Sequence, residues 1–244
     1  INDLNSISKI PKGACVELKI DTGMHRNGIQ IRELNQALES IESHGLLLKG
    51  IFTHFADPFK GDSIFEQKEL FDKVRQKIGS MNTNNDIRFH CSSSPGIFRI
   101  DNSQYDISRV GIALYGYVDL PEKIELPDLR PVLSLWAQKI STRDLVKGDR
   151  VGYGGVFEVK NNMQISTYDI GYGDGFMRLD ENKVANISDG RTIIGRVSMN
   201  NLAIAGNEQE ICIFNNVSEL SKVHSTISYE ILCRINNNIE RRVV

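Results

Sequence analysis

The chain has 244 residues, of which 40% are hydrophobic and 25% are charged, a mixture typical of a globular protein with a sizeable core. Its 29 basic and 31 acidic side chains leave a net charge of −2 without a basic stripe, so we expect no nucleic-acid partner. The longest apolar run, residues 110–118, is too short to cross a bilayer, so we expect no membrane partner. Cys15, Cys91, Cys212 and Cys233 lack metal-binding spacing, which favours reduced, mostly buried thiols in a cytoplasmic protein and no metal site.

The first 118 residues alternate between strand-like and helix-like segments. We predict four strands, at residues 16–20, 46–55 and 87–91 and in a short run that ends at Arg109. Such an alternation is typical of an α/β protein with a parallel sheet. Four βα units make half of an eight-stranded TIM-type (β/α)8 barrel, so we expect about four more units, roughly 100 residues, upstream of Ile1. The alternative is an open four-stranded sheet, but its edges would be exposed unless a partner covered them. We therefore favour the C-terminal half of a barrel for residues 1–118.

Helical spacing fills the gaps between these strands. Apolar residues recur every three or four positions over residues 31–41, and Gly45 follows as a C-terminal stop. A capping box from Ser63 to Glu66 predicts that a second helix opens at Ser63, and a short helix begins near Pro95.

The rhythm changes in the second half, residues 119–244. Short strand-like runs occur at residues 133–137, 165–170 and 193–199, and glycine-rich turns at 152–155 and 171–175 separate them. No long helical pattern occurs there. The half-barrel is therefore predicted to be followed by an all-β domain of residues 119–244.

Polar side chains gather where the predicted strands of the first half end. They are Lys19, Asp21 and Arg26 after the first strand, His54 after the second, His90 after the third and Arg109 after the fourth. Singly, each fits a structural role, such as an ion pair between Lys19 and Asp21 or between Asp106 and Arg109. Barrel strand ends face one mouth, where active sites are built, so four such ends in succession predict a catalytic site.

A second pattern predicts an anion site at the same mouth. Ser94 lies at a helix start, and the backbone N–H groups of Gly111 and Ile112 lie at the next helical turn. Helix N-termini bind anions, and barrels often hold a phosphate beside their last two strands. We therefore expect a phosphorylated ligand at Ser94, Gly111 and Ile112.

Seven motifs in register make the chain resemble the alanine racemase family over nearly its whole length. The motifs are Lys19–Arg26, Thr53–Ala56, His90–Ser94, Arg109–Gly116, Val151–Gly155, Ile170–Gly175 and Gly195–Met199. The resemblance implies a homodimeric isomerase with a barrel and a C-terminal β-domain. It also implies that pyridoxal 5′-phosphate is the cofactor, and that a two-base mechanism interconverts L-alanine and D-alanine and so supplies D-alanine for peptidoglycan.

The resemblance also implies roles for the strand-end residues. Ser94 and the backbone of Gly111 and Ile112 would bind the cofactor phosphate, in agreement with the predicted anion site. Arg109 would face the pyridine nitrogen, where a cation disfavours protonation of the ring. Arg26 would contact both the cofactor phenolate and the substrate carboxylate.

Other roles implied by the resemblance fall largely in the second half. Tyr153 would be one of the two catalytic bases, acting across a subunit interface, and His54 would connect it to Arg109 through hydrogen bonds. The backbone N–H of Met199 would meet the substrate carboxylate, and Tyr172 would line a narrow access path.

Lys19 matches a lysine that is carbamylated in many members of the family, where the resulting negative charge holds Arg26 in place. The family's Schiff-base lysine lies in an early motif, on the first barrel strand, and nothing similar occurs in this sequence. Lys19 belongs to a different strand and does not take that role.

Three positions depart from the family pattern. Asn200 stands where the family usually has aspartate, Ser93 where asparagine is common, and Asn237 near the place of a phosphate-binding tyrosine. The neutral Asn200 leaves open an alternative substrate, as in a serine or broad-specificity amino-acid racemase. The missing cofactor lysine leaves open a non-catalytic chain.

Overall fold

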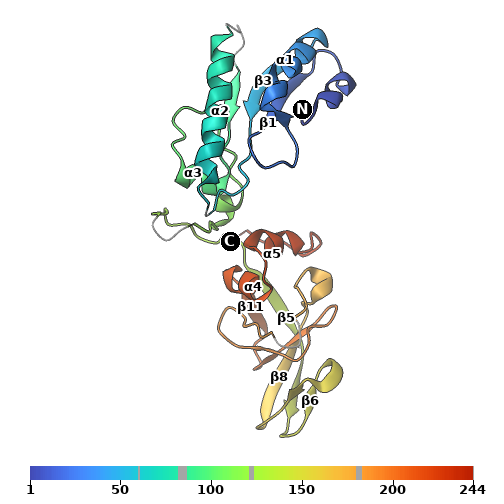
Figure 1. The fold of residues 1–244 in the computed structure, drawn as a ribbon. Helices are drawn as coiled ribbons and strands as arrows, with labels where there is room; N and C mark the ends of the chain where they lie inside the picture. Colours follow the sequence, from blue (N-terminus) through green and yellow to red (C-terminus); the bar gives the residue numbers. More distant parts are fainter. Residues whose placement is uncertain (60, 82–86, 121–123, 180–182, 244) are drawn as a thin grey trace. The chain divides into compact units, whose positions relative to one another are not determined.

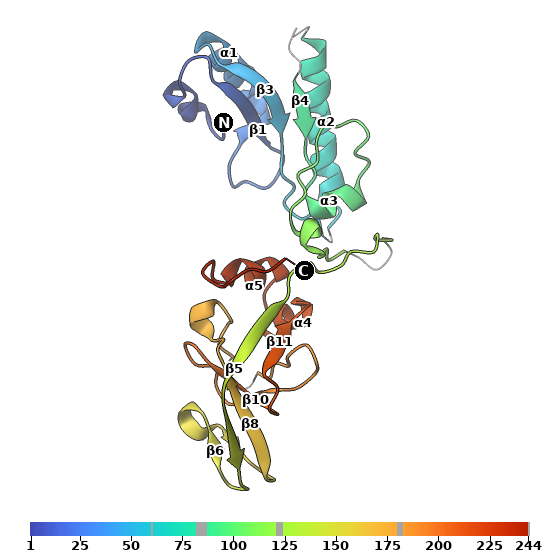
Figure 2. The same ribbon diagram turned by 180° about the vertical axis from the view of Figure 1, so that it is seen from behind.

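The computed structural model describes residues 1–59, 61–81, 87–120, 124–179 and 183–243. The chain forms two compact units, Ile1–Arg130 and Pro131–Val244 (Figures 1 and 2). The first unit contains a parallel sheet and the second an antiparallel one, so each unit has its own framework for the candidate residues.

The first unit is built on a parallel sheet with strand order β2-β1-β3-β4. Its strands and α-helices are β1 (Cys15–Asp21), β2 (Ile29–Gln30), α1 (Leu34–Ser43), β3 (Leu47–Phe52), α2 (Ser63–Ser80), β4 (Arg88–His90) and α3 (Ser94–Arg99). Its 3-10 turns are η1 (Leu4–Lys9), η2 (Ile31–Glu33) and η3 (Ile112–Tyr115). The parallel sheet predicted from the βα alternation is confirmed.

One face of this sheet carries the hydrophobic core. Leu18 and Ile20 of β1 and Ile51 of β3 are fully buried and pack with the apolar stripes of α1 and α2. Figures 1 and 2 show both helices on this face. Because successive strand residues point to opposite faces, Glu17 and Lys19 lie on the other face of β1. The charged residues of the strand are thereby kept away from the core.

The predicted fourth strand is wrong. Residues 106–109 follow β4 without forming a strand, although the N–H of Asp106 bonds to Phe89 (2.9 Å) and that of Arg109 to Ser92 (2.9 Å). The carboxylate of Asp106 accepts from the N–H of Phe89 (2.7 Å), so a side chain replaces a ladder bond. The two-residue strand β2 was not predicted.

The helix boundaries follow local chemistry. Gly45 ends α1 as predicted, with a φ of 69°, and its N–H bonds to Glu42 while that of Leu46 bonds to Ile41. This is the Schellman arrangement, which favours glycine. The capping box at Ser63 is wrong, because Ser63 is already helical and Asp62 is the residue before the first turn.

The second unit is an antiparallel sheet of order β11-β5-β8-β10-β9 with a separate ribbon of β6 and β7. Its strands are β5 (Leu135–Leu145), β6 (Arg150–Val151), β7 (Phe157–Glu158), β8 (Met163–Tyr168), β9 (Ile193–Ile194), β10 (Leu202–Ala205) and β11 (Glu210–Phe214). Its helical turns are η4 (Tyr153–Gly155), η5 (Tyr172–Asp174), α4 (Ser218–Val223) and α5 (Ser228–Arg234). The predicted β-domain is therefore present, with two short helices near its end.

Two further predictions are wrong, one about strand β9 of the second unit and one about the burial of the four cysteines of the chain. Strand β9 ends at Ile194, so the predicted strand-like run to Met199 is wrong; Gly195, with a φ of 69°, turns the chain into a loop. The thiols are not mostly buried, because among the four only Cys91 is buried while Cys15 and Cys233 are exposed. No helix in the described part of the chain is long and apolar enough to span a membrane.

Candidate active site

The loop after β1 is folded around Asp21. Its carboxylate accepts from the N–H groups of Gly23 and His25 (3.0 Å each) and lies 3.1 Å from Nδ1 of His25. Gly28 must be glycine, because its φ is 119° and a Cβ there would lie 2.9 Å from the backbone nitrogen of Asp21. This local network presents Arg26 as an exposed side chain beside the strand end.

Lys19 is buried at the strand end, with 6% of its surface exposed. Its Nζ bonds to the side-chain oxygen of Asn27, and Asp21 is engaged with His25, so the simple ion pair of Lys19 with Asp21 is absent from the described contacts. Burial, with added repulsion from Arg26 and Arg109, lowers the pKa of Lys19. The amine is thus easier to deprotonate than an exposed lysine.

The guanidinium of Arg109 is fixed from several sides. It donates to Nδ1 of His90 (2.6 Å), the carbonyl of Thr53 (2.7 Å), Nδ1 of His54 (3.3 Å) and the carbonyl of Cys91 (3.3 Å). It also lies 5.2 Å from the ring centre of Phe52, within cation–π range. Since Asp106 turns to Phe89, the alternative ion pair with Arg109 is absent from the described contacts. Arg109 is a cation with a set orientation.

His54 and His90 face this cation with unprotonated nitrogens. Burial first, and then the charge of Arg109, lowers the pKa of His54. Burial also lowers the pKa of His90, despite a hydrogen bond from its ring to Glu17. Both imidazoles are therefore neutral near pH 7, with Nδ1 accepting from Arg109 and the proton on Nε2.

The side chain of Ser94 contacts the turn at residues 111–113. The side chain is 1% exposed, and its Oγ accepts from the N–H of Gly111 (2.9 Å) and of Ala113 (3.2 Å). The N–H of Arg109 donates to the carbonyl of Ser92, two residues before Ser94 (2.9 Å). Because Oγ accepts two bonds, its hydroxyl proton is left to donate to an anion, which fits a phosphate group.

In the second unit, Tyr153 lies on a turn shaped by glycines. Gly152, Gly154 and Gly155 have φ values of 73°, 74° and 55°, and the Tyr153 side chain is 71% exposed. A Cβ at Gly152 would lie 3.6 Å from the backbone nitrogen of Arg196, so this turn runs beside the loop that leads to Met199. Two of the predicted motifs therefore meet.

The turns that carry Tyr172 and Met199 are bonded to each other. The N–H of Tyr172 donates to Ser198 (3.0 Å) and that of Gly173 to Met199 (2.7 Å). A Cβ at Gly171 would lie 2.3 Å from the carbonyl oxygen of Met199, so only glycine permits this approach. Both side chains are about half exposed, at 48% for Tyr172 and 55% for Met199.

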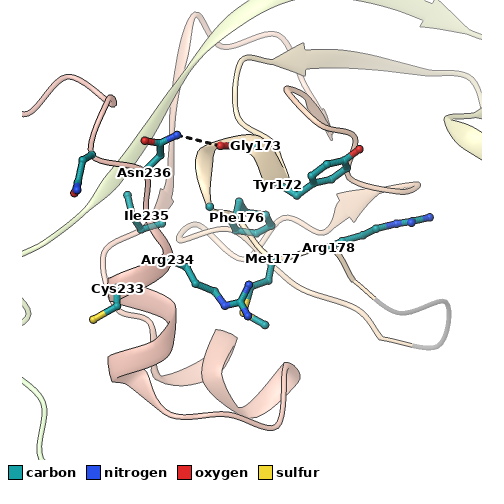
Figure 3. A pocket seen from close by; sticks show the side chains of 11 residues that line it. Tyr172, Gly173, Phe176, Met177, Arg178, Cys233, Arg234, Ile235 and Asn236 are labelled. Carbon is teal, nitrogen blue, oxygen red and sulfur yellow. Dashed lines mark hydrogen bonds between the residues drawn. The ribbon is translucent and has the colours of Figure 1, made fainter.

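An open pocket of about 820 Å³ adjoins Tyr172 (Figure 3). Its other wall is the end of α5 and the residues after it, and Asn236 bonds to the carbonyl of Gly173 (3.2 Å), as Figure 3 shows. A Cβ at Gly175 would lie 1.9 Å from the carbonyl oxygen of Arg234. Asn237 and Arg178 also line this pocket.

The predicted residues thus form two groups. Lys19, Arg26, His54, Ser94, Arg109, Gly111 and Ile112 belong to the first unit, and Tyr153, Tyr172 and Met199 to the second. The sequence reasoning missed Asn27, the partner of Lys19, and Glu17, the partner of His90. Period-two alternation was the available signal for Glu17, because it places that residue on the face of Lys19.

The residues of the first unit fit a phosphorylated cofactor with an aromatic ring. A hydroxyl donor at Ser94 suits the phosphate, and the fixed guanidinium of Arg109 suits a ring nitrogen that accepts a hydrogen bond. Together with its sheet order and its β-domain, this site defines an enzyme of the barrel-plus-β-domain class.

Comparison with known proteins gives the family. Residues 1–119 match the family model "Alanine racemase, N-terminal domain" and residues 132–243 match "Alanine racemase, C-terminal domain". The chain is 44% identical to the alanine racemase of a Nitratiruptor species over 99% of its length and 72% of that protein. The chain belongs to the alanine racemase family.

Solved structures agree in fold. The alanine racemase of Clostridium difficile 630 superposes with a TM-score of 0.85 at 24% identity, covering 98% of this chain and 68% of that one. The alanine racemase of Bacillus anthracis with bound L-Ala-P superposes with a TM-score of 0.79 at 26% identity, covering 91% of this chain and 62% of that one. The predicted part-barrel followed by a β-domain is confirmed as the fold class.

Proposed function

We propose that the enzyme formed by this chain interconverts L-alanine and D-alanine with pyridoxal 5′-phosphate, by a two-base mechanism, and supplies D-alanine for peptidoglycan. Two observations carry the proposal. The guanidinium of Arg109 is held by His54, His90 and the carbonyl of Thr53, and the hydroxyl oxygen of Ser94 accepts from the N–H of Gly111. The relative from Bacillus anthracis, which binds L-Ala-P, supports an alanine-like ligand. The proposal includes a cytoplasmic homodimer.

When bound, pyridoxal phosphate supplies an electron sink that makes the α-proton of an amino acid removable. Ser94 would donate its hydroxyl to the phosphate, next to the backbone of Gly111 and Ile112. Arg109 would face the ring nitrogen, and its permanent charge would keep a proton off that atom. A weaker sink suits a reaction that must return the proton to the same carbon.

Arg26 would reach the substrate carboxylate from the loop that Asp21 shapes. The exposed position of Arg26 supports this role, since its side chain is available to a ligand. The backbone N–H of Met199 would meet the same carboxylate from the second unit, and Tyr172 would line the access path.

Tyr153 would act as one of the two bases, on one face of the α-carbon, with His54 connecting it to Arg109. The exposure of Tyr153 on its own chain, 71%, supports a role across a subunit interface. The hydrogen bond between His54 and Arg109 supports the part of this connection that lies between those two residues. The phenol of Tyr153 would hold and move the proton, and the imidazole of His54 and the guanidinium of Arg109 would orient the phenol.

Lys19 would react with carbon dioxide to form a carbamate. The neutral amine attacks the carbon of CO₂, and the electrons of one C=O π bond move to its oxygen. The nitrogen then gives one proton to water, so the side chain carries a negative charge in place of a positive one. Burial beside Arg26 and Arg109 supports this reaction, because it lowers the pKa of the amine and offers partners to the anion. A carbon-13 signal from labelled bicarbonate should appear on the protein and disappear in Lys19→Arg.

Racemisation is the direct test. The complete polypeptide that carries these residues, supplied with pyridoxal phosphate, should convert either enantiomer of alanine into the other. Tyr153→Phe should slow exchange of the α-proton in heavy water by about 10²- to 10⁴-fold, first for one enantiomer. Tyr229→Phe, on α5, is the control. Equal exchange of both enantiomers in Tyr153→Phe would refute the role of the tyrosine.

A panel of amino acids, tested as substrates, distinguishes alanine racemisation from the alternative functions. Asn200 lies beside the turn of Tyr172, where a Cβ at Gly173 would meet its side-chain oxygen at 3.3 Å. Faster turnover of serine than of alanine would assign the enzyme to a serine or broad-specificity racemase. Absence of racemisation of every amino acid would favour the non-catalytic alternative.

A further inference from the structure

Glu17 reaches across the parallel sheet of the first unit. It lies on β1, yet its carboxylate contacts two residues of β4, with Oε1 2.8 Å from Nη2 of Arg88 and Oε2 2.9 Å from Nε2 of His90. Strand β3 separates β1 from β4 in the sheet order. The side chain of Glu17 must therefore pass over β3 to reach Arg88 and His90 on β4.

Gly50 opens that path. A register shift between Val16 and Glu17 places Gly50 directly opposite Glu17, and Gly50 in turn pairs with Arg88. A Cβ at Gly50 would lie 2.8 Å from Oε1 and 3.0 Å from Cδ of Glu17. Gly50 is not among the glycines with positive φ, so its backbone does not demand glycine. The missing side chain serves the passage of Glu17.

The contact with Glu17 fixes the state of His90. A carboxylate accepts, so the ring donates its Nε2–H to Glu17, and Nδ1 of the neutral imidazole is left to accept from Arg109 at 2.6 Å. The ring plane is set as well, because Phe52 stacks on it at 5.0 Å with an interplanar angle of 3°. Without an acceptor at Nε2, the imidazole is free to carry its proton on Nδ1, which would oppose the N–H of Arg109.

We propose that Glu17 is a positioning residue that acts through His90 to hold the guanidinium of Arg109 in place. The chain of contacts runs from Glu17 to Nε2 of His90, and from Nδ1 of His90 to Nη1 of Arg109. The benefit to catalysis rests on the proposed function, in which Arg109 faces the cofactor ring. The contacts among Glu17, His90 and Arg109 stand without it.

Nitrogen-15 NMR of labelled histidine in the 244-residue chain, held near pH 7.5, tests the relay without any cofactor. The chain has five histidines, and His90→Gln assigns the signal. We expect a single Nε2–H tautomer for His90 in the unsubstituted chain and a mixture of both tautomers in Glu17→Leu. Glu17→Gln keeps an acceptor oxygen at the same reach and should restore the single tautomer.

Two further variants keep the result interpretable. Gly50→Ala leaves Glu17 in the sequence but blocks its path, so it should give the tautomer mixture of Glu17→Leu even if that variant unfolds. Glu39→Leu, on the exposed side of α1, should leave His90 unchanged. A single Nε2–H tautomer in folded Glu17→Leu or Gly50→Ala would overturn the proposal.

Turnover by the complete enzyme then separates this proposal from the proposed function. Glu17→Leu should lower kcat for alanine on the order of tenfold with less change in KM, as for outer residues that orient a site, and Glu17→Gln should recover most of it. Racemisation that is absent in the unsubstituted enzyme refutes the proposed function, while the tautomers still decide the relay. Normal racemisation with an unchanged tautomer in Glu17→Leu refutes the relay alone.

Discussion

The two units hold their candidate residues by different means. In the first unit, the side chains of Arg109 and Ser94 are fixed by hydrogen bonds, to His90 at the end of a parallel strand and to the N–H of Gly111 before η3. In the second unit, Tyr153 and Met199 are exposed, and the turns that carry them are fixed by backbone bonds and close glycine contacts. Side-chain hydrogen bonds thus position the candidate residues of the first unit, whereas the shape of the main chain positions those of the second unit.

This difference follows from the two sheets. Ends of parallel strands bring short polar segments to one edge, where long side chains can reach one another. The antiparallel sheet leaves its connections as loops, and loops that touch through their backbones require residues without a Cβ. Removing a side chain should therefore damage the first unit, and adding one should damage the second.

The largest effect is expected from Gly171→Ala in the second unit. Its new Cβ would lie 2.3 Å from the carbonyl oxygen of Met199 and 2.4 Å from that of Ser198, and backbone atoms cannot yield as a side chain does. We expect a loss of about 3 kcal/mol in the free energy of unfolding. Urea unfolding followed by the fluorescence of Trp136, the single tryptophan, measures it within this unit.

Hydrogen exchange supplies the control for Gly171→Ala. The amides of β1 belong to the first unit and should keep their protection in this variant. Loss of protection in β1 equal to that in β8 would contradict the separation of the two kinds of site.

The next effect is expected from Ser94→Ala in the first unit. The half-buried N–H groups of Gly111 and Ala113 would both lose their shared acceptor, and a donor left without a partner costs about 1–3 kcal/mol when it is buried. We expect the free energy of unfolding to fall by about 2 kcal/mol. Amide exchange at both N–H groups should accelerate. Ser93→Ala is the matched control, since Ser93 makes no side-chain cap bond to the helix, and an equal loss there would refute the role of Ser94.

The strand positions that bear the site were largely predictable from the sequence, whereas the contacts were not. Alternating apolar residues located β1, β3 and β4, and the polar residues after them marked the strand ends. Gly45 was predictable as a stop because helix ends favour glycine. These signals are local, since each depends on residues within one or two turns of chain.

Contacts between distant segments carried no such signal. Residues 106–109 have a strand-like composition, but Asp106 bonds to a backbone N–H of β4 and interrupts the ladder. The reach of Glu17 over Gly50 depends on a register shift that only the paired strands define. The contact of Gly171 with Met199 likewise joins two loops that the sequence keeps apart.

A smaller effect is expected from acid. Burial and the charge of Arg109 lower the pKa values of His54 and His90 in the folded chain below the ordinary histidine value of 6.5. When the pH falls below 6.5, these histidines therefore take up protons in the unfolded chain before they do so in the folded chain. Stability from these groups is therefore complete above pH 6.5 and declines as the pH falls below it. Unfolding free energies at about pH 7.5 and about pH 5.5 measure the decline, which should be smaller in His54→Gln; an equal decline there would assign the effect to other groups.

The smallest effect has the opposite sign. Gly79 lies near the end of α2 in the first unit, and a Cβ there would meet nothing within 4 Å. Alanine is favoured over glycine in helices by about 1 kcal/mol, less near a fraying end, so Gly79→Ala should stabilise the first unit by about 0.5 kcal/mol. Urea unfolding followed by exchange of the β1 amides measures it. The same substitution that destabilises the second unit at Gly171 then stabilises the first, because a helix surface has room for a Cβ and a backbone contact does not. Destabilisation by Gly79→Ala would show that glycines serve both units alike.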